Sequence, residues 1–131
     1  MSSIAIIGEL NLDFIVTGVP ALPQLGEELI VGGMDLTLGS SSAILACQLA
    51  KLGDEVRFVS KVGGDEFGRR ALSFLREKGV PTDSVTAIPE MSSGLTISIV
   101  LGTERAMLTQ LGTIEEMRGE DIDWEKLEGC R

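Results

Sequence analysis

The feature that most constrains the fold is an alternation of short apolar runs with helix-type segments. Residues 4–7 and 56–59 are apolar runs of the length found in buried parallel strands. Segment 42–52 is apolar nearly all round, which indicates a helix buried on more than one side. Segment 65–78 has the spacing of an amphipathic helix and is followed by Gly79. Strand, helix, strand, helix with short connections predicts a right-handed parallel α/β unit.

Short β-type segments interrupt this unit at two places. The first lies in a stretch rich in Gly and Pro, which predicts an irregular antiparallel excursion. The second contains Gly102-Thr103-Glu104-Arg105 between two apolar runs, which predicts an antiparallel hairpin. An acidic segment near the end predicts a short helix. The expected strands are 14–16, 29–31 extended by 35–38, 95–101 and 106–111, and the expected terminal helix is 121–127.

The charge balance limits the partners of the chain. Its 131 residues fit one domain and include 20 acidic against 11 basic residues, a net charge of −9 at pH 7. Such a surface repels phosphate backbones and anionic lipid, so we expect no nucleic-acid and no membrane partner. Glu9 and Asp13 interrupt the first apolar run, so we expect neither a signal peptide nor a membrane-spanning helix.

The cysteines and the absence of histidine exclude several chemistries. Cys47 lies inside the apolar helix, Cys130 is next to last, and no CxxC pair occurs. A zinc site would need carboxylates in addition to two distant thiols, so we expect no metal site. Reduced thiols indicate a cytoplasmic protein. With no histidine in the chain, Ser-His-Asp and Cys-His catalysis are excluded.

Two polar residues follow the first apolar run. Asn11 and Asp13 are two apart, so in an extended chain both side chains point to one side. An amide and a carboxylate placed in this way can bind several hydroxyl groups of a small ligand. The alternative is a turn, because Asn and Asp are common where strands end and bond to nearby backbone. From these two residues alone, the turn is the simpler interpretation.

A Gly-Ser segment precedes the buried helix. Gly39, Ser40 and Ser41 would lie at its start, where free N–H groups and the positive end of the helix dipole can receive hydroxyl or anionic groups. The alternative is ordinary capping, since Ser is a preferred N-cap residue. Capping needs one serine, whereas three follow the glycine. The segment is therefore a second candidate for ligand binding.

The segment Gly63-Gly64-Asp65-Glu66-Phe67 has the letters of the diguanylate cyclase signature. In that family the signature lies on a hairpin, follows Arg-x and has a metal-binding carboxylate cluster upstream. Here Lys61 occupies the Arg position, helix-forming residues follow, and no such cluster precedes. We therefore reject the cyclase interpretation; the family resemblance described next implies instead that Asp65 is the N-cap of a helix and Gly68 a site of close packing.

In their order along the chain, segments 8–13, 39–43 and 62–68 resemble the N-terminal half of the ribokinase-like (PfkB) carbohydrate kinases, and the resemblance covers almost the whole chain. It implies an α/β fold: the first half of a parallel-sheet, Rossmann-like core together with a small antiparallel β lid over the sugar. The implied core comprises residues 1–13, 39–91 and 112–131, and the implied lid comprises 14–38 and 92–111.

The resemblance also implies roles for individual residues. Asn11 and Asp13 would bind the sugar, the segment from Gly39 to Ser41 would line its site, and Thr96 and Ser98 on a lid strand would lie over it. The family usually has Gly-Gly-x-x-x-Asn before the helix, and its last Asn contacts the sugar. Here Ser40 replaces the second Gly and Ile44 replaces the Asn.

For the complete protein, the resemblance implies ATP-dependent phosphorylation of a sugar or nucleoside hydroxyl, with ATP and Mg²⁺ as cofactors. The family's catalytic Gly-Ala-Gly-Asp segment is absent from these residues, and no P-loop or dinucleotide motif occurs. We therefore expect no catalytic residue, no bound cofactor and no activity in the isolated chain. The family also implies a homodimer through the lid strands. The alternatives are a non-catalytic sugar-binding or oligomerisation module, and an α/β fragment without a ligand.

Overall fold

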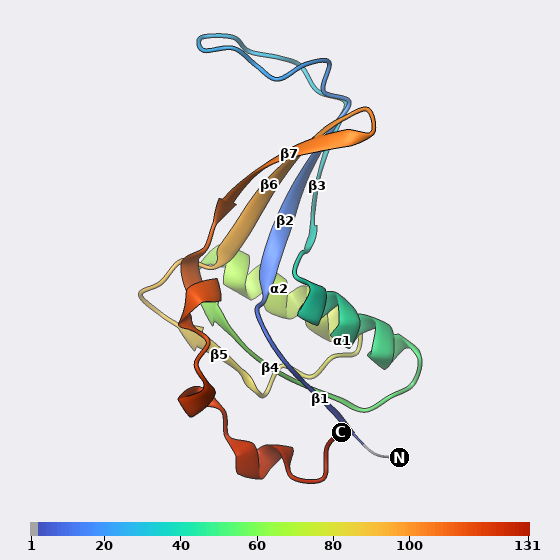
Figure 1. The fold of residues 1–131 in the computed structure, drawn as a ribbon, viewed down its shortest axis with the longest axis vertical. Helices are drawn as coiled ribbons and strands as arrows, with labels where there is room; N and C mark the ends of the chain where they lie inside the picture. Colours follow the sequence, from blue (N-terminus) through green and yellow to red (C-terminus); the bar gives the residue numbers. More distant parts are fainter. Residues whose placement is uncertain (1–2) are drawn as a thin grey trace.

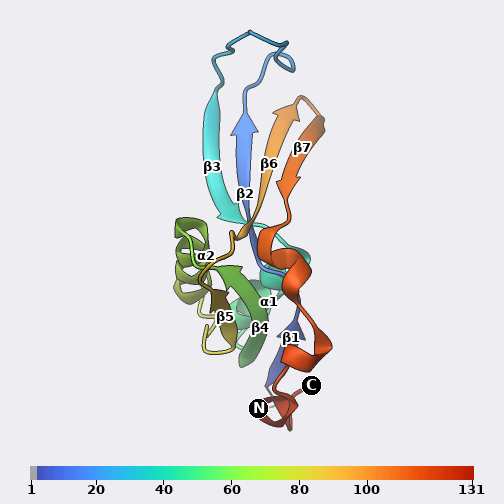
Figure 2. The same cartoon turned by 90° about the vertical axis from the view of Figure 1, so that its left-hand side faces the viewer.

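A computed structural model describes residues 3–131 and contains two sheets joined end to end (Figure 1). The lower sheet is parallel and has three strands in the order β1-β4-β5. Helices α1 and α2 connect its strands, and Figure 2 shows α2 on one side of this sheet and the C-terminal segment on the other. The elements of this core are β1 (Ile4–Ile7), α1 (Ser41–Lys51), β4 (Val56–Gly63), α2 (Glu66–Glu77) and β5 (Val85–Ile88).

The upper sheet has four strands in the order β3-β2-β6-β7 and extends away from the core (Figure 2). Its outer pairs are antiparallel, as expected, whereas the central pair β2–β6 is parallel. Strands β2 and β6 follow β1 and β5, whose carboxyl ends meet at the same edge of a parallel sheet, so both leave the core in one direction. The strands are β2 (Asn11–Thr17), β3 (Gly33–Leu38), β6 (Gly94–Leu101) and β7 (Glu104–Gln110).

The core lies where the lower sheet meets the two helices. Phe58 of β4 and Leu75 of α2 are completely buried, and Ala43 and Ala46 let α1 lie close to the strands. Leu12, at the base of β2, is also completely buried in this cluster, so the upper sheet shares the core of the lower one. Truncating Phe58 to Ala would remove about 3–5 kcal/mol of stability, the usual range for a buried Phe.

The helix ends confirm the expected signals. Ser40 is the N-cap of α1, and Gly53, with a φ of 95°, follows its last turn. Asp65 is the N-cap of α2: its Oδ1 accepts a hydrogen bond from Gly68 N–H at 2.8 Å. A Cβ at Gly68 would overlap the carbonyl oxygen of Gly63, so the expected close packing is present. The Gly63–Phe67 segment therefore joins a strand to a helix and is not the hairpin of a cyclase.

The same aspartate ties α2 to the upper sheet. Oδ2 of Asp65 accepts a hydrogen bond from Ser93 N–H at 2.9 Å, and Oδ1 accepts one from Ser93 Oγ at 2.7 Å. Gly63 N–H donates to Ser93 Oγ at 2.9 Å. Ser93 directly precedes β6, so this buried network fixes the point at which β6 leaves the core.

Three expectations for the elements need correction. The expected strand at 29–31 is absent: Leu29 and Val31 lie near Ile97 and Ile99, but residues 29–31 pair with no strand, and β3 begins only at Gly33. The expected helix at 121–127 is replaced by two 3-10 helices, Gly119–Asp121 and Trp124–Leu127. Strand β5 was not expected, because its four residues have no distinctive alternation and form a strand through pairing with β4.

The C-terminal segment packs along the lower sheet and contacts β4 and β1. It contains a first 3-10 helix, Gly112–Glu116, which contacts β4, and Lys61 Nζ forms an ion pair with Asp121 at 2.6 Å. Arg131 then hydrogen-bonds to Ser3 and Ala5 beside β1. In the part of the chain from residue 3 onward, no helix is both long and apolar enough to cross a membrane.

Candidate functional site

The site begins with the two polar residues at the start of β2. Asn11 is buried and Asp13 is partly exposed, and Asn11 Nδ2 lies 3.4 Å from Asp13 Oδ1. The contact is long for a hydrogen bond, so both groups retain capacity for a further partner. Both residues pair with neighbouring strands within the upper sheet, which excludes the turn interpretation.

Gly39 brings the start of α1 against this pair. Its N–H donates to the Asn11 carbonyl oxygen at 2.8 Å, and an added Cβ would lie 2.8 Å from Asn11 Nδ2 and would overlap Asp13 Oδ1. Only a residue without a side chain allows this approach with the Asp13 side chain in place. The structure therefore brings Gly39 against Asn11 and Asp13, which precede it by more than twenty positions in the sequence.

The three serines after Gly39 have different surroundings. Ser40 has a φ of 57° and a ψ of 135°, an uncommon conformation for a residue with a side chain, and its Oγ lies 3.4 Å from Ala43 N–H. Ser42 Oγ donates to the Glu9 carbonyl oxygen at 2.6 Å. Ser41 is exposed, and its hydroxyl has no hydrogen bond to any residue in the range 3–131. Ser41 thus has a free hydroxyl beside the helix start.

One row of polar side chains crosses the upper sheet at the level of Asp13. Asp13 pairs with Thr37 on β3 and with Thr96 on β6, and Thr96 pairs with Thr109 on β7. Thr96 Oγ1 and Thr109 Oγ1 are hydrogen-bonded to each other at 2.9 Å. We call Thr37, Asp13, Thr96 and Thr109 the polar row. Thr37 and Thr109 were not expected from the sequence, because only the pairing register reveals that they lie beside Asp13.

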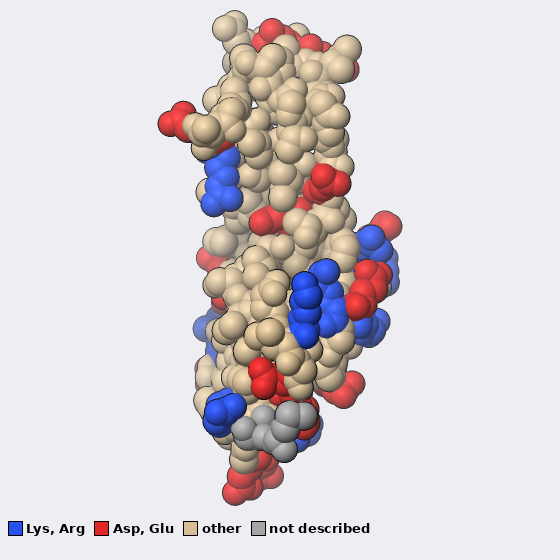
Figure 3. Space-filling model, turned by 90° about the vertical axis from the view of Figure 1, so that its right-hand side faces the viewer, with Lys and Arg blue, Asp and Glu red and all other residues tan. Residues whose placement is uncertain are grey.

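Ser98 lies one step further along the same face. It pairs with Ile15 and Met107 and is buried, with 5% of its surface exposed. Ile44 lies one turn into α1 and is 48% exposed. On the face of the molecule that Figure 3 shows, the upper part is mostly uncharged, with a few acidic and basic side chains.

Burial shifts the pKa of the central carboxyl group. Partial burial raises the pKa of Asp13 above its ordinary value of 3.8, and the positive charge of Arg105 on β7 opposes part of this rise. The carboxyl group therefore has less hydration than an exposed aspartate and gains more from a ligand that donates hydrogen bonds to it.

These groups suit a ligand with several hydroxyl groups. The carboxylate accepts hydrogen bonds, the amide donates and accepts them, and the hydroxyls of Ser41 and Thr96 can do both. No three Asp, Glu or Cys residues within the described range form a cluster that could hold a metal ion. The fold defines a class of α/β proteins in which a helix start meets a second β sheet, with the polar side chains of Asn11 and Asp13 at this junction.

Comparison with known proteins identifies the family within this class. The chain belongs to the pfkB family of carbohydrate kinases, whose family model matches residues 1–129. It is 35% identical over 101 residues to a ribokinase of Bacillus subtilis, and the matched region covers 77% of this chain and 34% of that protein. The chain therefore spans about a third of that relative.

Solved structures share the fold. A ribokinase from Thermotoga maritima has a TM-score of 0.84 at 23% identity, covering 99% of this chain and 43% of the other. A sugar kinase from Pyrococcus horikoshii in complex with ATP has a TM-score of 0.79 at 26% identity, covering 95% of this chain and 40% of the other. The α/β fold with a ribokinase-like lower sheet and a β lid is thus confirmed.

Proposed function

We propose that the complete protein transfers a phosphoryl group from ATP to a hydroxyl group of a sugar or nucleoside, and that these 131 residues supply the acceptor-binding part. Family membership supports the reaction class. The observation that carries the proposal is the close approach of Gly39, which places the Asp13 carboxylate and the Asn11 amide beside the start of α1.

In this proposal, each residue has a defined part. Asp13 accepts hydrogen bonds from two acceptor hydroxyls, and Asn11 bonds to a neighbouring hydroxyl oxygen. The free hydroxyl of Ser41 and the amides at the start of α1 bind a further polar group. Thr96 and Ser98 lie on the lid strand above the acceptor. Holding the acceptor in one orientation is the contribution that this part makes to the reaction.

The phosphoryl donor binds elsewhere in this proposal. The Pyrococcus horikoshii relative is described in complex with ATP, which supports ATP with Mg²⁺ as cofactors of the complete protein. The described residues offer no set of carboxylates that fits a Mg²⁺ ion, so we assign no cofactor contact to them. Chemistry at the donor therefore depends on residues outside this sequence.

A non-catalytic sugar-binding or oligomerisation module is the second candidate. It is favoured by Ile44, a half-exposed apolar side chain at the position where the family usually has an Asn that contacts the sugar. An acceptor bound at Asp13 would lose one polar contact there. The binding site itself is common to both candidates, and they differ only in whether phosphoryl transfer follows.

We also propose how the chain is divided, how it associates and where it is located. The lid comprises residues 14–38 and 92–111, with the remaining residues in the core, and two copies associate through their lids. The support is a row of apolar side chains, Phe14, Leu36, Ile97 and Leu108, on the opposite face of the sheet from the polar row. A cytoplasmic location is supported by Cys47 and Cys130, which are both free thiols.

The test measures acceptor binding by the 131-residue chain. Saturation-transfer NMR with ribose, fructose and inosine should detect binding of at least one of them. Asp13→Asn should weaken it about tenfold or more, because a hydrogen bond to a carboxylate contributes about 1.5–3 kcal/mol. Asp83→Asn, an exposed aspartate on the core, is the control and should bind as the unaltered chain does. Equal binding by both variants would show that Asp13 is not part of an acceptor site.

A further inference from the structure

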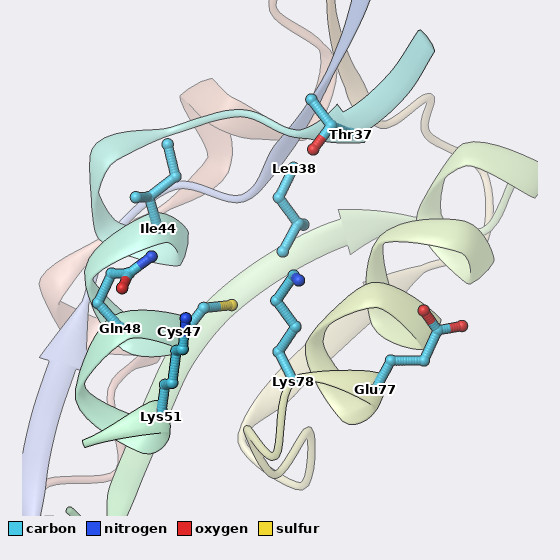
Figure 4. Close-up of a pocket in the computed structure, with 8 residues that line it drawn as sticks. All are labelled: Thr37, Leu38, Ile44, Cys47, Gln48, Lys51, Glu77 and Lys78. Atoms are coloured by element: carbon cyan, nitrogen blue, oxygen red, sulfur yellow. The ribbon is translucent and has the colours of Figure 1, made fainter.

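A cavity separate from the Asn11–Asp13 pair lies between the two helices. It has a volume of about 550 Å³ and opens between α1 and α2 below the end of β3 (Figure 4). Cavities of roughly 300–1,000 Å³ are the size that binds small organic molecules. Its walls come from three elements: β3 contributes Thr37 and Leu38, the outer face of α1 contributes a stripe from Ile44 to Lys51, and the end of α2 contributes Glu77 and Lys78.

The floor of this cavity is apolar. Leu38 and Cys47 are buried, with 8% and 5% of their surfaces exposed, and Ile44 adds a half-exposed side chain at the upper end. A flat or branched hydrocarbon group placed here would remove both its own surface and that of Ile44 from water. The cavity can therefore bind the apolar part of a ligand.

The rim of the cavity has polar side chains without partners in the protein. Lys51, Lys78, Gln48 and Glu77 form no side-chain hydrogen bond and no ion pair with any residue from 3 to 131. The lining includes two lysines and one glutamate, so the cavity has a net charge of +1 in a chain whose net charge is −9. Figure 4 shows Lys78 reaching between the helices toward Cys47 and Leu38.

The positions of the lysines have one explanation without a ligand. Lys51 is in the last turn of α1 and Lys78 follows α2, where a positive charge stabilises the negative end of the helix dipole. Stabilisation of the helix dipoles does not require both lysines to line the same cavity. Burial raises the pKa of the Cys47 thiol and the nearby Lys78 charge opposes the rise, which places this charge beside the apolar floor. Charge and apolar surface thus occur together.

We propose that the cavity between α1 and α2 binds a small organic anion, with its apolar part on Leu38, Cys47 and Ile44 and its carboxylate or phosphate group between Lys51 and Lys78. The lining of this cavity does not include Asn11 or Asp13, so the site differs from the proposed acceptor-binding pair, although it adjoins that pair at Thr37 and Ile44. A neutral sugar has no group that complements the lysines, and the Asp13 carboxylate disfavours an anion at the Asn11–Asp13 pair.

The experiment uses the 131-residue chain labelled with ¹⁵N and two pairs of probes. Phenyl phosphate and benzoate are the anions, and benzyl alcohol and benzamide are their neutral counterparts. We expect both anions to shift the amide signals of Cys47 and Gln48 in a saturable way and to bind at least about fivefold more tightly than the neutral probes. Both anions should also bind less tightly in 0.5 M salt than in 0.05 M salt, because the Debye length is about threefold shorter at the higher concentration.

Variants then identify the site. The double variant Lys51→Gln/Lys78→Gln should weaken binding of both anions about fivefold or more, and Glu77→Gln should strengthen it. Lys126→Gln, an exposed lysine on the opposite side of the core sheet, should have no effect. Asp13→Asn should also leave anion binding unchanged, which separates this site from the acceptor site. Equal affinities for anionic and neutral probes, or anion binding that survives the double lysine change, would overturn the proposal.

Discussion

At the scale of single residues, Gly39 is the position on which the proposed acceptor site depends. Gly39→Ala should lower the free energy of unfolding by about 1–3 kcal/mol, since the added methyl group overlaps the Asp13 and Asn11 side chains. Urea unfolding measures this change. In the double variant Gly39→Ala/Asp13→Ala, part of the loss should be recovered, because one of the two obstructing side chains is gone. A Gly39→Ala protein of unaltered stability would show that the approach is not tight.

Ser40 stores strain at the same site. Its φ of 57° is uncommon for a residue with a Cβ, so Ser40→Gly should raise the free energy of unfolding by roughly 1 kcal/mol. Glycine is itself an acceptable N-cap, so losing the hydroxyl costs only a few tenths of a kcal/mol. Ser40→Ala is the matched control: it keeps the strain, loses the cap and should be less stable than the unaltered chain. If Ser40→Gly is also destabilising, the hydroxyl matters more than the backbone strain.

Asp13 should make the protein less stable at neutral pH. Its pKa is raised in the folded state, so the fold binds the proton more tightly than the unfolded chain does. Stability must then fall as pH rises from the ordinary value of 3.8 through the raised pKa. Asp13→Asn removes this contribution and should raise the melting temperature at pH 7, with a difference that shrinks as the pH falls toward 3.8. Melting curves from pH 3.5 to pH 7 test the sign.

At the scale of elements, Asp65 joins α2 to the upper sheet. Burial opposes ionisation of this carboxyl group, but hydrogen bonds from Ser93 and Gly68 outweigh it and lower the pKa. The resulting stability is fully present above the ordinary value of 3.8 and is lost as pH falls through the lowered pKa. Asp65→Ala should cost about 1–2 kcal/mol at pH 7 through the lost cap alone, and hydrogen exchange should increase in β6 as well as in α2.

The control for this prediction is Asp123→Ala. Asp123 also caps a short helix, Trp124–Leu127, but it is exposed and has no bond to the upper sheet. This change should leave hydrogen exchange in β6 unaltered. If Asp65→Ala affects α2 alone, the bonds from Asp65 to Ser93 do not hold β6 in place.

At the scale of the whole molecule, the apolar row predicts association. Leu108 and Ile97 are 64% and 37% exposed on one face of the upper sheet, and such a surface is stabilised by a partner. Light scattering at micromolar concentration should give a mass near twice 13.9 kDa. Leu108→Glu should give a monomer. Met107→Glu, an exposed neighbour on the opposite face of the same strand, should remain a dimer. If the unaltered chain is monomeric at high concentration, the proposed lid interface is wrong.

Much of the fold was determined by local sequence signals. The strand at residues 4–7, the helix after Gly39 and the cap at Asp65 follow from apolar periodicity and from N-cap chemistry, which act within a few residues. The same holds for the hairpin of β6 and β7. The resemblance of separated motifs, in their order along the chain, was sufficient to identify the family that the comparisons confirm.

Tertiary structure alone decided the features that depend on pairing between distant segments. The four residues of β5 form a strand because they pair with the edge of β4, whereas residues 29–31 pair with no strand. The parallel β2–β6 pair places Thr96 beside Asp13, and register adds Thr37 and Thr109 to that row. A short stretch of sequence does not reveal which strand it will pair with, because the backbone groups that form the hydrogen bonds belong to segments far apart in the chain. The sequence by itself thus determined most of the helices and strands and the central polar pair, whereas β5 and the side chains that surround that pair were determined only by the packed sheets.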